Sequence, residues 1–308
     1  MTGVCPNLET VLNGFLFCRS LWITWLKPGA NEKLKPTELS LPNTSSKTSP
    51  LIIGHRGASA LAPENSLAAF RRALEVGADG VELDVRLAKD GVPVVIHDAT
   101  MRRTGRCAGV IARMTSGELR QTDVGSWFNR VHPQFARDDY SRQFVPTLDQ
   151  VFDFFKQRPT RHEVIYVEIK TDKAEDTYVD ITGSVAQLIK DHQLHRRVVV
   201  VSFNLRAVAR IKMIHSSIAT GALFEPRRNS LKIIRKHPMI TAALECGAEQ
   251  ILLHRLIATR RLLELAAESG LRPVVWTVDD PKWLRRRASF GIHAVITNNP
   301  AVMIAATF

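Results

Sequence analysis

The sequence predicts a single (β/α)8 barrel that follows an N-terminal extension. Short runs rich in β-branched residues alternate with helical patterns over residues 51–308, which is typical of βα units joined into a parallel sheet. We count eight such runs, and closing the sheet into a barrel is the simplest way to leave no strand edge exposed. Barrels of this type commonly reach about 250 residues as one unit, which fits the length of this region.

The elements follow one another in a regular order. The predicted barrel strands are Leu51–His55, Gly80–Val85, Val164–Ile169, Val198–Ser202, Thr220–Phe224, Gln250–Leu253, Pro273–Val278 and Ala294–Thr297. The predicted helices are Ser66–Val76, Leu148–Lys156, Asp176–His192, Thr259–Ser269 and Trp283–Phe290. One further run, Pro93–His97, follows Asp90-Gly91, and Asp-Gly between apolar runs is a hairpin signal. We therefore expect Pro93–His97 to return antiparallel to the second barrel strand.

Two segments interrupt this order. Residues 98–145 show no clear period and are too many for an ordinary loop, so we expect a small inserted subdomain above the barrel mouth. Residues 1–50 form the N-terminal extension, of which 27–50 are rich in Pro, Ser and Thr and resemble a linker. The domain that follows spans 51–308.

The N-terminal extension contains an apolar run, residues 11–26, with Arg19 in its middle. The run is shorter than the ~20 residues that a bilayer-spanning helix needs, and it lacks the flanks of a secretory signal. Two interpretations stay open. The run packs on the barrel as a helix, or it contacts a membrane surface as an interfacial segment.

Cysteine spacing and net charge limit the cellular location and the class of partner that the sequence favours. The cysteines Cys5, Cys18, Cys107 and Cys246 have no metal-binding spacing, so we expect free thiols in a reducing, cytoplasmic location. The formal net charge of +12 attracts anions in general. No nucleic-acid-binding motif accompanies the charge, so we expect no nucleic-acid partner. We interpret three arginine clusters as solvated faces: Arg102-Arg103, Arg227-Arg228 and Arg285-Arg286-Arg287.

Two histidines lie at or beside the C-terminal ends of strands, where barrels of this type have their catalytic residues. His55 and Arg56 end the first predicted strand between two glycines, and His97 ends the hairpin return. Histidine exchanges protons near neutral pH, and arginine suits phosphate oxygens. A pair of histidines can supply a general acid and a general base, although a His-Arg pair by itself fits a structural role equally well. His254, which ends the sixth predicted strand, is a further candidate.

Three carboxylates end the neighbouring strands. Glu82 and Asp84 alternate along the second predicted strand and so point the same way, and Glu168 ends the third. An all-oxygen set suits Mg²⁺ or Ca²⁺ and not Zn²⁺. Lys170 lies on the same side as Glu168 and can contact a phosphate as a point charge. Salt bridges within the barrel are the alternative interpretation of Glu82 and Asp84.

These motifs together resemble the glycerophosphodiester phosphodiesterase family. The matching stretches are HRGASALAPENS (55–66), GVELDVRLAKDGVPVVIHD (80–98), VEIK (167–170), WTVD (276–279) and AVITNNP (294–300). The family fold is a TIM barrel with a small insertion after the second strand, in agreement with the strand order above. The resemblance runs from about Leu51 to the C-terminus.

The resemblance implies a role for each matching residue. It places the catalytic histidines at His55 and His97, the metal ligands at Glu82, Asp84 and Glu168, the phosphate contacts at Arg56 and Lys170, an aromatic contact to glycerol at Trp276, and supporting residues at Glu64 and Asn65. Three positions depart from the family pattern. Ser66 replaces Thr, Asp279 stands where Asn is common, and Asn298 stands where Asp is usual. The last two bear on local hydrogen bonding or specificity.

The activity that the resemblance implies is metal-dependent hydrolysis of a small-molecule glycerophosphodiester to sn-glycerol 3-phosphate and an alcohol. The family is thought to use the glycerol 2-hydroxyl as nucleophile. A lysophospholipase D acting on membrane lipids is the nearest alternative, favoured by the basic charge and by residues 11–26. A non-catalytic phosphodiester-binding barrel is the alternative from another class, and the presence of every expected histidine and ligand argues against it.

Overall fold

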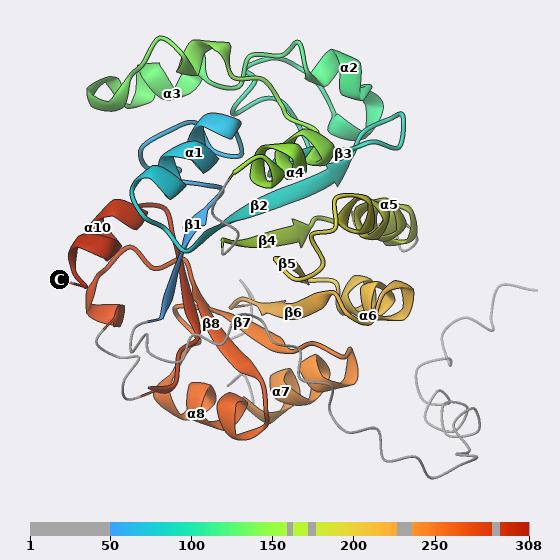
Figure 1. The fold of residues 1–308 in the computed structure, drawn as a ribbon, viewed down its shortest axis with the longest axis vertical. Helices are drawn as coiled ribbons and strands as arrows, with labels where there is room; N and C mark the ends of the chain where they lie inside the picture. The colour runs from blue at the N-terminus through green and yellow to red at the C-terminus, as the bar shows by residue number, and fades with distance from the viewer. Residues whose placement is uncertain (1–49, 159–162, 172–176, 227–235, 285–289, 308) are drawn as a thin grey trace, which may run out of the picture. The chain divides into compact units, whose positions relative to one another are not determined.

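A closed parallel barrel forms the centre of the domain. The computed structural model describes residues 50–158, 163–171, 177–226, 236–284 and 290–307. Over these residues the sheet order is β1-β9-β8-β7-β6-β5-β4-β2-β3, and pairing of β1 with β2 closes it (Figure 1). The strands are β1 (Leu51–His55), β2 (Gly80–Leu87), β3 (Pro93–Val95), β4 (Val164–Ile169), β5 (Val198–Ser202), β6 (Ala219–Phe224), β7 (Gln250–His254), β8 (Arg272–Trp276) and β9 (Ala294–Thr297). The predicted (β/α)8 barrel is confirmed.

β3 is the antiparallel return that the Asp90-Gly91 turn predicted. It pairs with the end of β2, with Val95 opposite Val85 and Pro93 opposite Leu87. β3 therefore stands outside the ring of parallel strands and carries the chain from β2 to His97.

Helices cover the outside of the barrel (Figure 1). They are α1 (Leu67–Glu75), α4 (Leu148–Lys156), α5 (Thr177–Asp191), α6 (Leu205–Ile214), α7 (Lys236–Glu245), α8 (Arg260–Glu268) and α10 (Pro300–Ala305). Several begin at a side-chain cap. Ser66, Thr147 and Thr259 each accept a hydrogen bond from the third backbone N–H of the helix that follows, which satisfies one of its unpaired donors. The sequence analysis did not predict α6, α7 or α10.

The core divides into an outer layer and a barrel interior. Outward-facing strand residues such as Val81, Leu83 and Val167 pack against the helices. Inward-facing residues fill the barrel, among them Ile53, Tyr166 and others of the same face: Val199, Val201, Leu223, Leu252, Val274 and Ile296. Because side chains fill the barrel interior, no channel runs through it, and ligands are confined to the ends of the strands.

The chain between β3 and α4 folds as short helical pieces beside α1 and β3 (Figure 1). These pieces are η2 (Ile111–Arg113), α2 (Ser116–Leu119), α3 (Ser126–Val131), η3 (Pro133–Phe135) and η4 (Tyr140–Arg142). Two small apolar clusters hold them, one around Met101 and Leu119 and one around Phe128 and Tyr140. Helices this short produce little sequence period, which is why residues 98–145 look irregular in the sequence.

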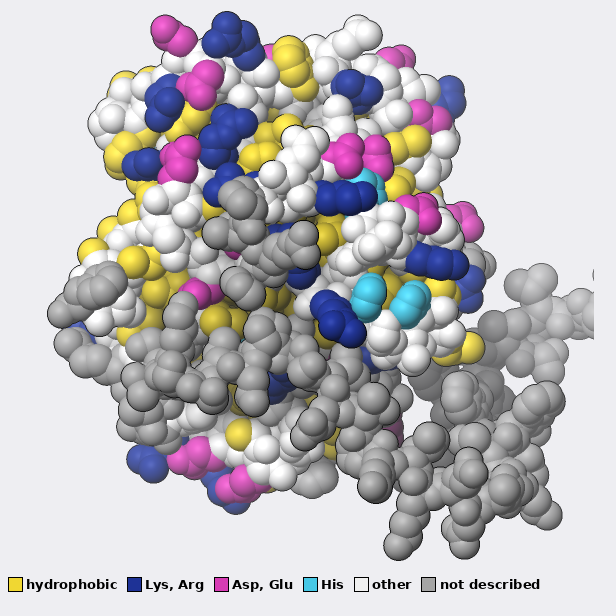
Figure 2. Space-filling view, in the orientation of Figure 1, with side chains coloured by type: hydrophobic (Ala, Val, Ile, Leu, Met, Phe, Trp, Pro, Cys, Tyr) yellow, Lys and Arg dark blue, Asp and Glu magenta, His cyan; other side chains and the backbone are white. Residues whose placement is uncertain are grey.

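Basic and acidic side chains are mixed over the segment that carries α2 and α3, on the face drawn in Figure 2. The net charge of +12 therefore does not gather into a single basic patch on the described part of this face. No helix among the described residues is both long and apolar enough to cross a membrane.

Several predictions fall outside the described residues. They are the N-terminal extension with its run at 11–26, Cys5, Cys18, Arg227-Arg228, Arg285-Arg286-Arg287, residue 176 of one predicted helix and 285–289 of another. The division at residue 50 thus stays a prediction. Cys107 and Cys246 lie within the described chain, and both are free thiols, one exposed and one buried.

Candidate active site

A cavity of about 480 Å³ lies at the C-terminal ends of the barrel strands. Seven of the predicted site residues line it: His55, Arg56, Glu82, His97, Glu168, Lys170 and Trp276. The other three predicted residues lie beside it and contact the lining, as Asp84 pairs with Lys170, Glu64 pairs with Arg56, and Asn65 N donates to Arg56 O. The structure therefore brings all the predicted residues together at one mouth of the barrel.

Strand register explains why these residues meet. In the parallel pair of β1 and β2, His55 stands opposite Glu82, and in the pair of β2 and β4, Asp84 stands opposite Glu168. Residues opposite each other on parallel strands point to the same face, and every second residue returns to that face. The inward face of β2 thus presents Glu82 and Asp84 one above the other, directly over the filled interior.

The three carboxylates are buried and close together. Glu82, Asp84 and Glu168 are 3%, 0% and 8% exposed, and each offers an oxygen within 4.8 Å of the others. Burial raises the pKa of Glu82 well above its usual range, and the negative charges of Asp84 and Glu168 raise it further. Burial likewise raises the pKa of Glu168 to about 7. Three carboxylates in one buried cluster thus need added positive charge to ionise together.

Two cations of the chain already approach this cluster. The Lys170 ammonium lies 2.9 Å from Asp84 Oδ1 and 2.6 Å from Glu168 Oε1. The Arg56 guanidinium approaches Asp84 Oδ2 at 3.3 Å, and Asn65 Nδ2 donates to the same oxygen at 2.8 Å. Burial opposes ionisation of Asp84, but the charges of Lys170 and Arg56 outweigh it and hold its pKa below the usual range. Of the pair Glu82 and Asp84, the salt-bridge interpretation is therefore correct for Asp84, and Glu168 is paired with Lys170 as well.

The cluster also fits a hard divalent cation. Its donors are all carboxylate oxygens, the ligand type that Mg²⁺ and Ca²⁺ prefer and that Zn²⁺ sites use sparingly. Lys170 and Arg56 contact Asp84 and Glu168, whereas Glu82 receives a backbone hydrogen bond from Arg56 N at 2.9 Å and has His55 Nε2 at 3.9 Å. Burial is the main cause of the raised pKa of Glu82, and a bound cation would favour the ionised form of this carboxyl.

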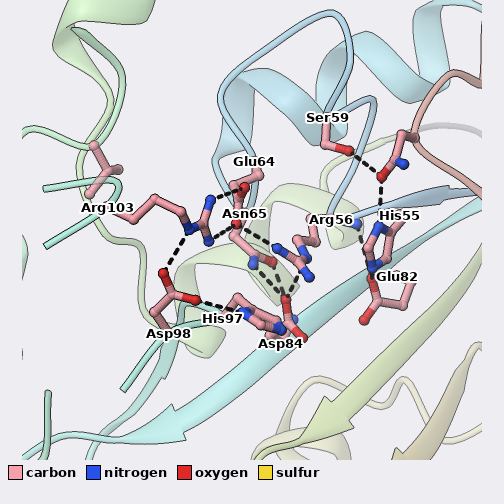
Figure 3. Close-up of polar contacts among 12 residues, drawn as sticks. His55, Arg56, Ser59, Glu64, Asn65, Glu82, Asp84, His97, Asp98 and Arg103 are labelled. Atoms are coloured by element: carbon pink, nitrogen blue, oxygen red, sulfur yellow. Dashed lines mark hydrogen bonds and ion pairs between the residues drawn. The ribbon is translucent and has the colours of Figure 1, made fainter. Parts of the chain in front are cut away.

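Hydrogen bonds fix which nitrogen of His55 carries the proton. Asp279 can only accept, and Asn298 Nδ2 donates to its Oδ2 at 2.8 Å. The carbonyl oxygen of Asn298 therefore faces His55, whose Nδ1 lies 2.7 Å from it and must donate. Ser59 Oγ donates to the same oxygen at 3.0 Å (Figure 3). In the neutral ring this leaves Nε2 as the acceptor nitrogen. Burial lowers the pKa of His55 to about 4, and the charge of Arg56 acts in the same direction.

His97 has a carboxylate partner in place of an amide. Its Nδ1 lies 2.7 Å from Asp98 Oδ1, and Arg103 Nε donates to Asp98 Oδ2 at 2.7 Å (Figure 3). Burial lowers the pKa of His97 as well, although the charge of Asp84 opposes the change. His97 is thus also held with Nδ1 as donor.

Trp276 closes another part of the cavity with its neighbours. Phe203 packs edge-on against it with ring centroids 5.6 Å apart, and His254 does so at 5.1 Å. His254 does not line the cavity, so its place is beside Trp276 and not at the carboxylates. The indole Nε1 of Trp276 is buried and has no hydrogen-bond partner within the described chain, which leaves a donor available to a ligand.

Sequence analysis missed four residues around the histidines: Asp98, Arg103, Asp279 and Asn298. Asp98 directly follows His97, so its proximity was a usable signal. Asp279 and Asn298 were noticed only as separate departures from a family pattern, and the structure shows that they pair with each other. Arg103, interpreted as part of a solvated face, reaches across to Glu64 and Asp98.

Comparison with known proteins agrees with this geometry. The model of the glycerophosphoryl diester phosphodiesterase family matches residues 55–302. A glycerophosphodiester phosphodiesterase of Caldanaerobacter subterraneus is 31% identical over 82% of this chain and 96% of its own length. One from Bacillus subtilis is 28% identical over 81% of this chain and 84% of its own.

Solved structures share the fold. A glycerophosphodiester phosphodiesterase from Agrobacterium tumefaciens superposes with a TM-score of 0.66 at 26% identity, over 83% of this chain and 99% of its own. An Oleispira antarctica phosphodiesterase, determined in complex with the product sn-glycerol-3-phosphate, superposes with a TM-score of 0.71 at 24% identity, over 84% of this chain and 97% of its own. From its barrel, its site and these relatives, the chain belongs to the glycerophosphoryl diester phosphodiesterase family.

Proposed function

We propose that this protein hydrolyses glycerophosphodiesters to sn-glycerol 3-phosphate and an alcohol, with a divalent cation and two histidines. The observation that carries the proposal is the meeting of three buried carboxylates and two cavity-lining histidines at one barrel mouth. Family membership supports this class of reaction, because relatives at 31% and 28% identity have it in their names.

Charge in the site suits a phosphodiester. Glu82, Asp84 and Glu168 would hold Mg²⁺ or Ca²⁺, which when bound would supply positive charge to the phosphoryl oxygens. Arg56 and Lys170 line the same cavity and add two cations of the chain itself. Donors and cations that are fixed before the reaction stabilise the charge that develops on the phosphoryl group without reorganising.

The two histidines can move the protons. Each ring is held through Nδ1, so each has Nε2 left to exchange a proton with the substrate. One histidine would deprotonate the nucleophile, and the other would protonate the departing alcohol oxygen. Hydrolysis needs both, because an alkoxide without a proton donor is a poor leaving group.

The rest of the cavity supplies an apolar wall for the carbon parts of the substrate. Trp276, Phe203 and Leu223 line it. Trp276 would cover the glycerol carbons with its ring, while its buried Nε1 offers a hydrogen bond to a hydroxyl. A mixed aromatic and polar lining is typical of pockets that bind small polar molecules with a carbon skeleton.

Metal removal tests the proposal directly. We expect treatment with a chelator to lower the release of sn-glycerol 3-phosphate from glycerophosphocholine by at least about 100-fold, and Mg²⁺ or Ca²⁺ to restore it. Glu82→Gln should weaken binding of the restoring metal, measured by calorimetry, whereas the exposed Glu268→Gln on α8 should not. Full turnover by metal-free protein would exclude the cation from the reaction. Parallel assays with lysophosphatidylcholine separate this function from a lysophospholipase D.

A further inference from the structure

Arg103 makes three hydrogen bonds although it does not line the cavity. Its Nη1 and Nη2 donate to the two carboxylate oxygens of Glu64 at 2.6 and 2.7 Å, and its Nε donates to Asp98 Oδ2 at 2.7 Å. Its side chain is 42% exposed, so much of it faces solvent. Arg103 lies 39 residues from Glu64 in the chain, within the segment that connects β3 to η2.

Each carboxylate that Arg103 holds contacts a residue of the cavity. Glu64 Oε1 also accepts a hydrogen bond from Arg56 Nη1 at 2.9 Å, and Asp98 Oδ1 is paired with His97 Nδ1 at 2.7 Å. Figure 3 shows the resulting series, which runs from Arg56 through Glu64, Arg103 and Asp98 to His97. Glu64 lies between the two arginines, and Asp98 lies between Arg103 and the His97 ring, so each carboxylate of the series has a cation beside it.

The guanidinium shape matters for this arrangement. Both oxygens of Glu64 are engaged by the two terminal nitrogens of Arg103, and the third donor, Nε, points toward Asp98. A lysine ammonium is a point charge and cannot meet the planar geometry of all three bonds at once. Burial raises the pKa of Glu64, yet hydrogen bonding from Arg103 and the charges of both arginines outweigh it and keep the pKa low, so Glu64 is a permanent acceptor.

We propose that Arg103 is a positioning residue that sets the His97 ring through Asp98 and the Arg56 guanidinium through Glu64. It would act through these partners and not touch the substrate. Arg56 has a second anchor in Asp84, at 3.3 Å, whereas the Nδ1 bond to Asp98 is the only hydrogen bond recorded for the His97 ring within the described chain. Loss of Arg103 should therefore disturb His97 more than Arg56, and kcat more than KM. This inference rests on the proposed function for its kinetic part.

Substitution at two adjacent arginines tests the role. Arg103→Met is expected to lower kcat about 10- to 100-fold, the usual effect of removing a residue that orients a site group, with KM within about threefold. Arg103→Lys keeps the charge and should recover less than a third of the loss, because its ammonium cannot reproduce the fork. The exposed neighbour Arg102→Met is the matched control and should stay within about twofold of wild type.

A double-mutant cycle distinguishes positioning from a general loss of packing. If Arg103 acts through Asp98, Arg103→Met should lower kcat no further than about threefold in an Asp98→Asn background. Multiplying effects in the double variant would show that Arg103 does not act through Asp98, and the proposal would be wrong. Equal melting temperatures of Arg103→Met and Arg102→Met would show that the segment between β3 and η2 remains folded.

A spectroscopic measurement decides the role without any turnover. In protein labelled with ¹⁵N-histidine, the His97 ring nitrogens, assigned with a His97→Asn variant, should shift in Arg103→Met and not in Arg102→Met. Unchanged His97 ring resonances in Arg103→Met would overturn the proposal. If the wild-type protein released no sn-glycerol 3-phosphate, the proposed function would fail, and the His97 resonances would still decide whether Arg103 positions the ring.

Discussion

The two histidines of the site face one cavity but are held by different partners. His55 Nδ1 donates to the neutral amide oxygen of Asn298, whereas His97 Nδ1 is paired with the carboxylate of Asp98. The His55 side chain is also the more buried, at 17% exposed against 33% for His97. The two imidazole rings of this site therefore have different electrostatic environments.

The difference indicates which histidine gives the proton. Burial lowers the pKa of both rings, but the carboxylate beside His97 Nδ1 offsets part of that lowering and favours the imidazolium form that a general acid needs. An amide oxygen provides no full charge, and burial next to Arg56 favours the neutral ring that a general base requires. We therefore expect His55 to take the first proton and His97 to protonate the leaving alcohol.

The largest expected effect separates these two roles. His55→Ala and His97→Ala should each lower kcat for glycerophosphocholine by roughly 10²–10⁴, the scale of acid–base groups. A glycerophosphodiester of p-nitrophenol needs no acid, because its leaving group is stable as an anion. The loss in His97→Ala should therefore largely disappear with that substrate, while the loss in His55→Ala should persist. Initial rates on both substrates give the answer.

His195→Ala serves as the control, since His195 lies between α5 and β5, near the opposite ends of the strands, and stacks on His215. Its rates should match wild type within about twofold. If the activated substrate rescued His55→Ala and not His97→Ala, the two roles would be reversed.

A smaller effect is expected from substitutions of the two residues that hold the His55 ring, Asp279 and Asn298. Asp279→Asn removes the obligate acceptor that orients Asn298, and Asn298→Asp sets two carboxylates against each other at 2.8 Å spacing. Each single change should lower kcat about 10- to 100-fold. The double exchange, Asp279→Asn with Asn298→Asp, restores a donor–acceptor pair but sets a carboxylate beside His55 Nδ1, so it should recover only part of the loss.

Additive losses in the double exchange would contradict this pairing. Asp280→Asn offers a control on the adjacent residue, which is exposed and whose Oδ1 accepts from Lys282 N. Its kcat should remain within about twofold of wild type.

The smallest effect on turnover is expected for a substitution inside the barrel, below the two histidines. Tyr166 Oη donates to Gln250 Oε1 at 2.9 Å inside the barrel, and both residues are buried. Tyr166→Phe leaves a buried amide oxygen without its donor and should lower the free energy of unfolding by about 1–3 kcal/mol, measured with urea. We expect kcat to change less than about twofold.

Tyr140→Phe is a matched control in the segment between β3 and α4, where the hydroxyl donates at 3.2 Å to the carbonyl oxygen of Leu61, a partly exposed residue. It should lower the free energy of unfolding by about 0.5–1.5 kcal/mol. A tenfold fall in kcat for Tyr166→Phe would show that packing inside the barrel affects the rate. The different partners of His55 and His97 would then not be enough to explain how the rate is set.

Strands and their terminal residues were predictable because their signals are local. β1, β4, β5 and β9 have the predicted bounds, since each is a compact β-branched run ended by polar residues. β8 ends at Trp276, two residues before the prediction. Val278 is buried and continues the apolar pattern, but its N–H donates to Ile296 O after the chain has left the regular ladder. Pairing with a neighbouring strand, and not apolar character, decides where a strand ends.

The amino-acid pattern was sufficient to predict the barrel and to place the three carboxylates and the two histidines at its strand ends. The alternation of residues along a strand and the position of the strand ends place these side chains independently of the loop conformations. The folded structure was needed to find the partner of His55 and the arginine that holds Asp98 beside His97. Asn298 reaches His55 across 243 residues, and Arg103 reaches Glu64 across 39. Such bonds depend on the closure of β1 against β9 and on the path of the segment after β3, and neither has a local signal in the chain. For that reason Asn298 and Arg103 are recognisable as partners only in the folded protein, whereas Asp98 directly follows His97 in the chain.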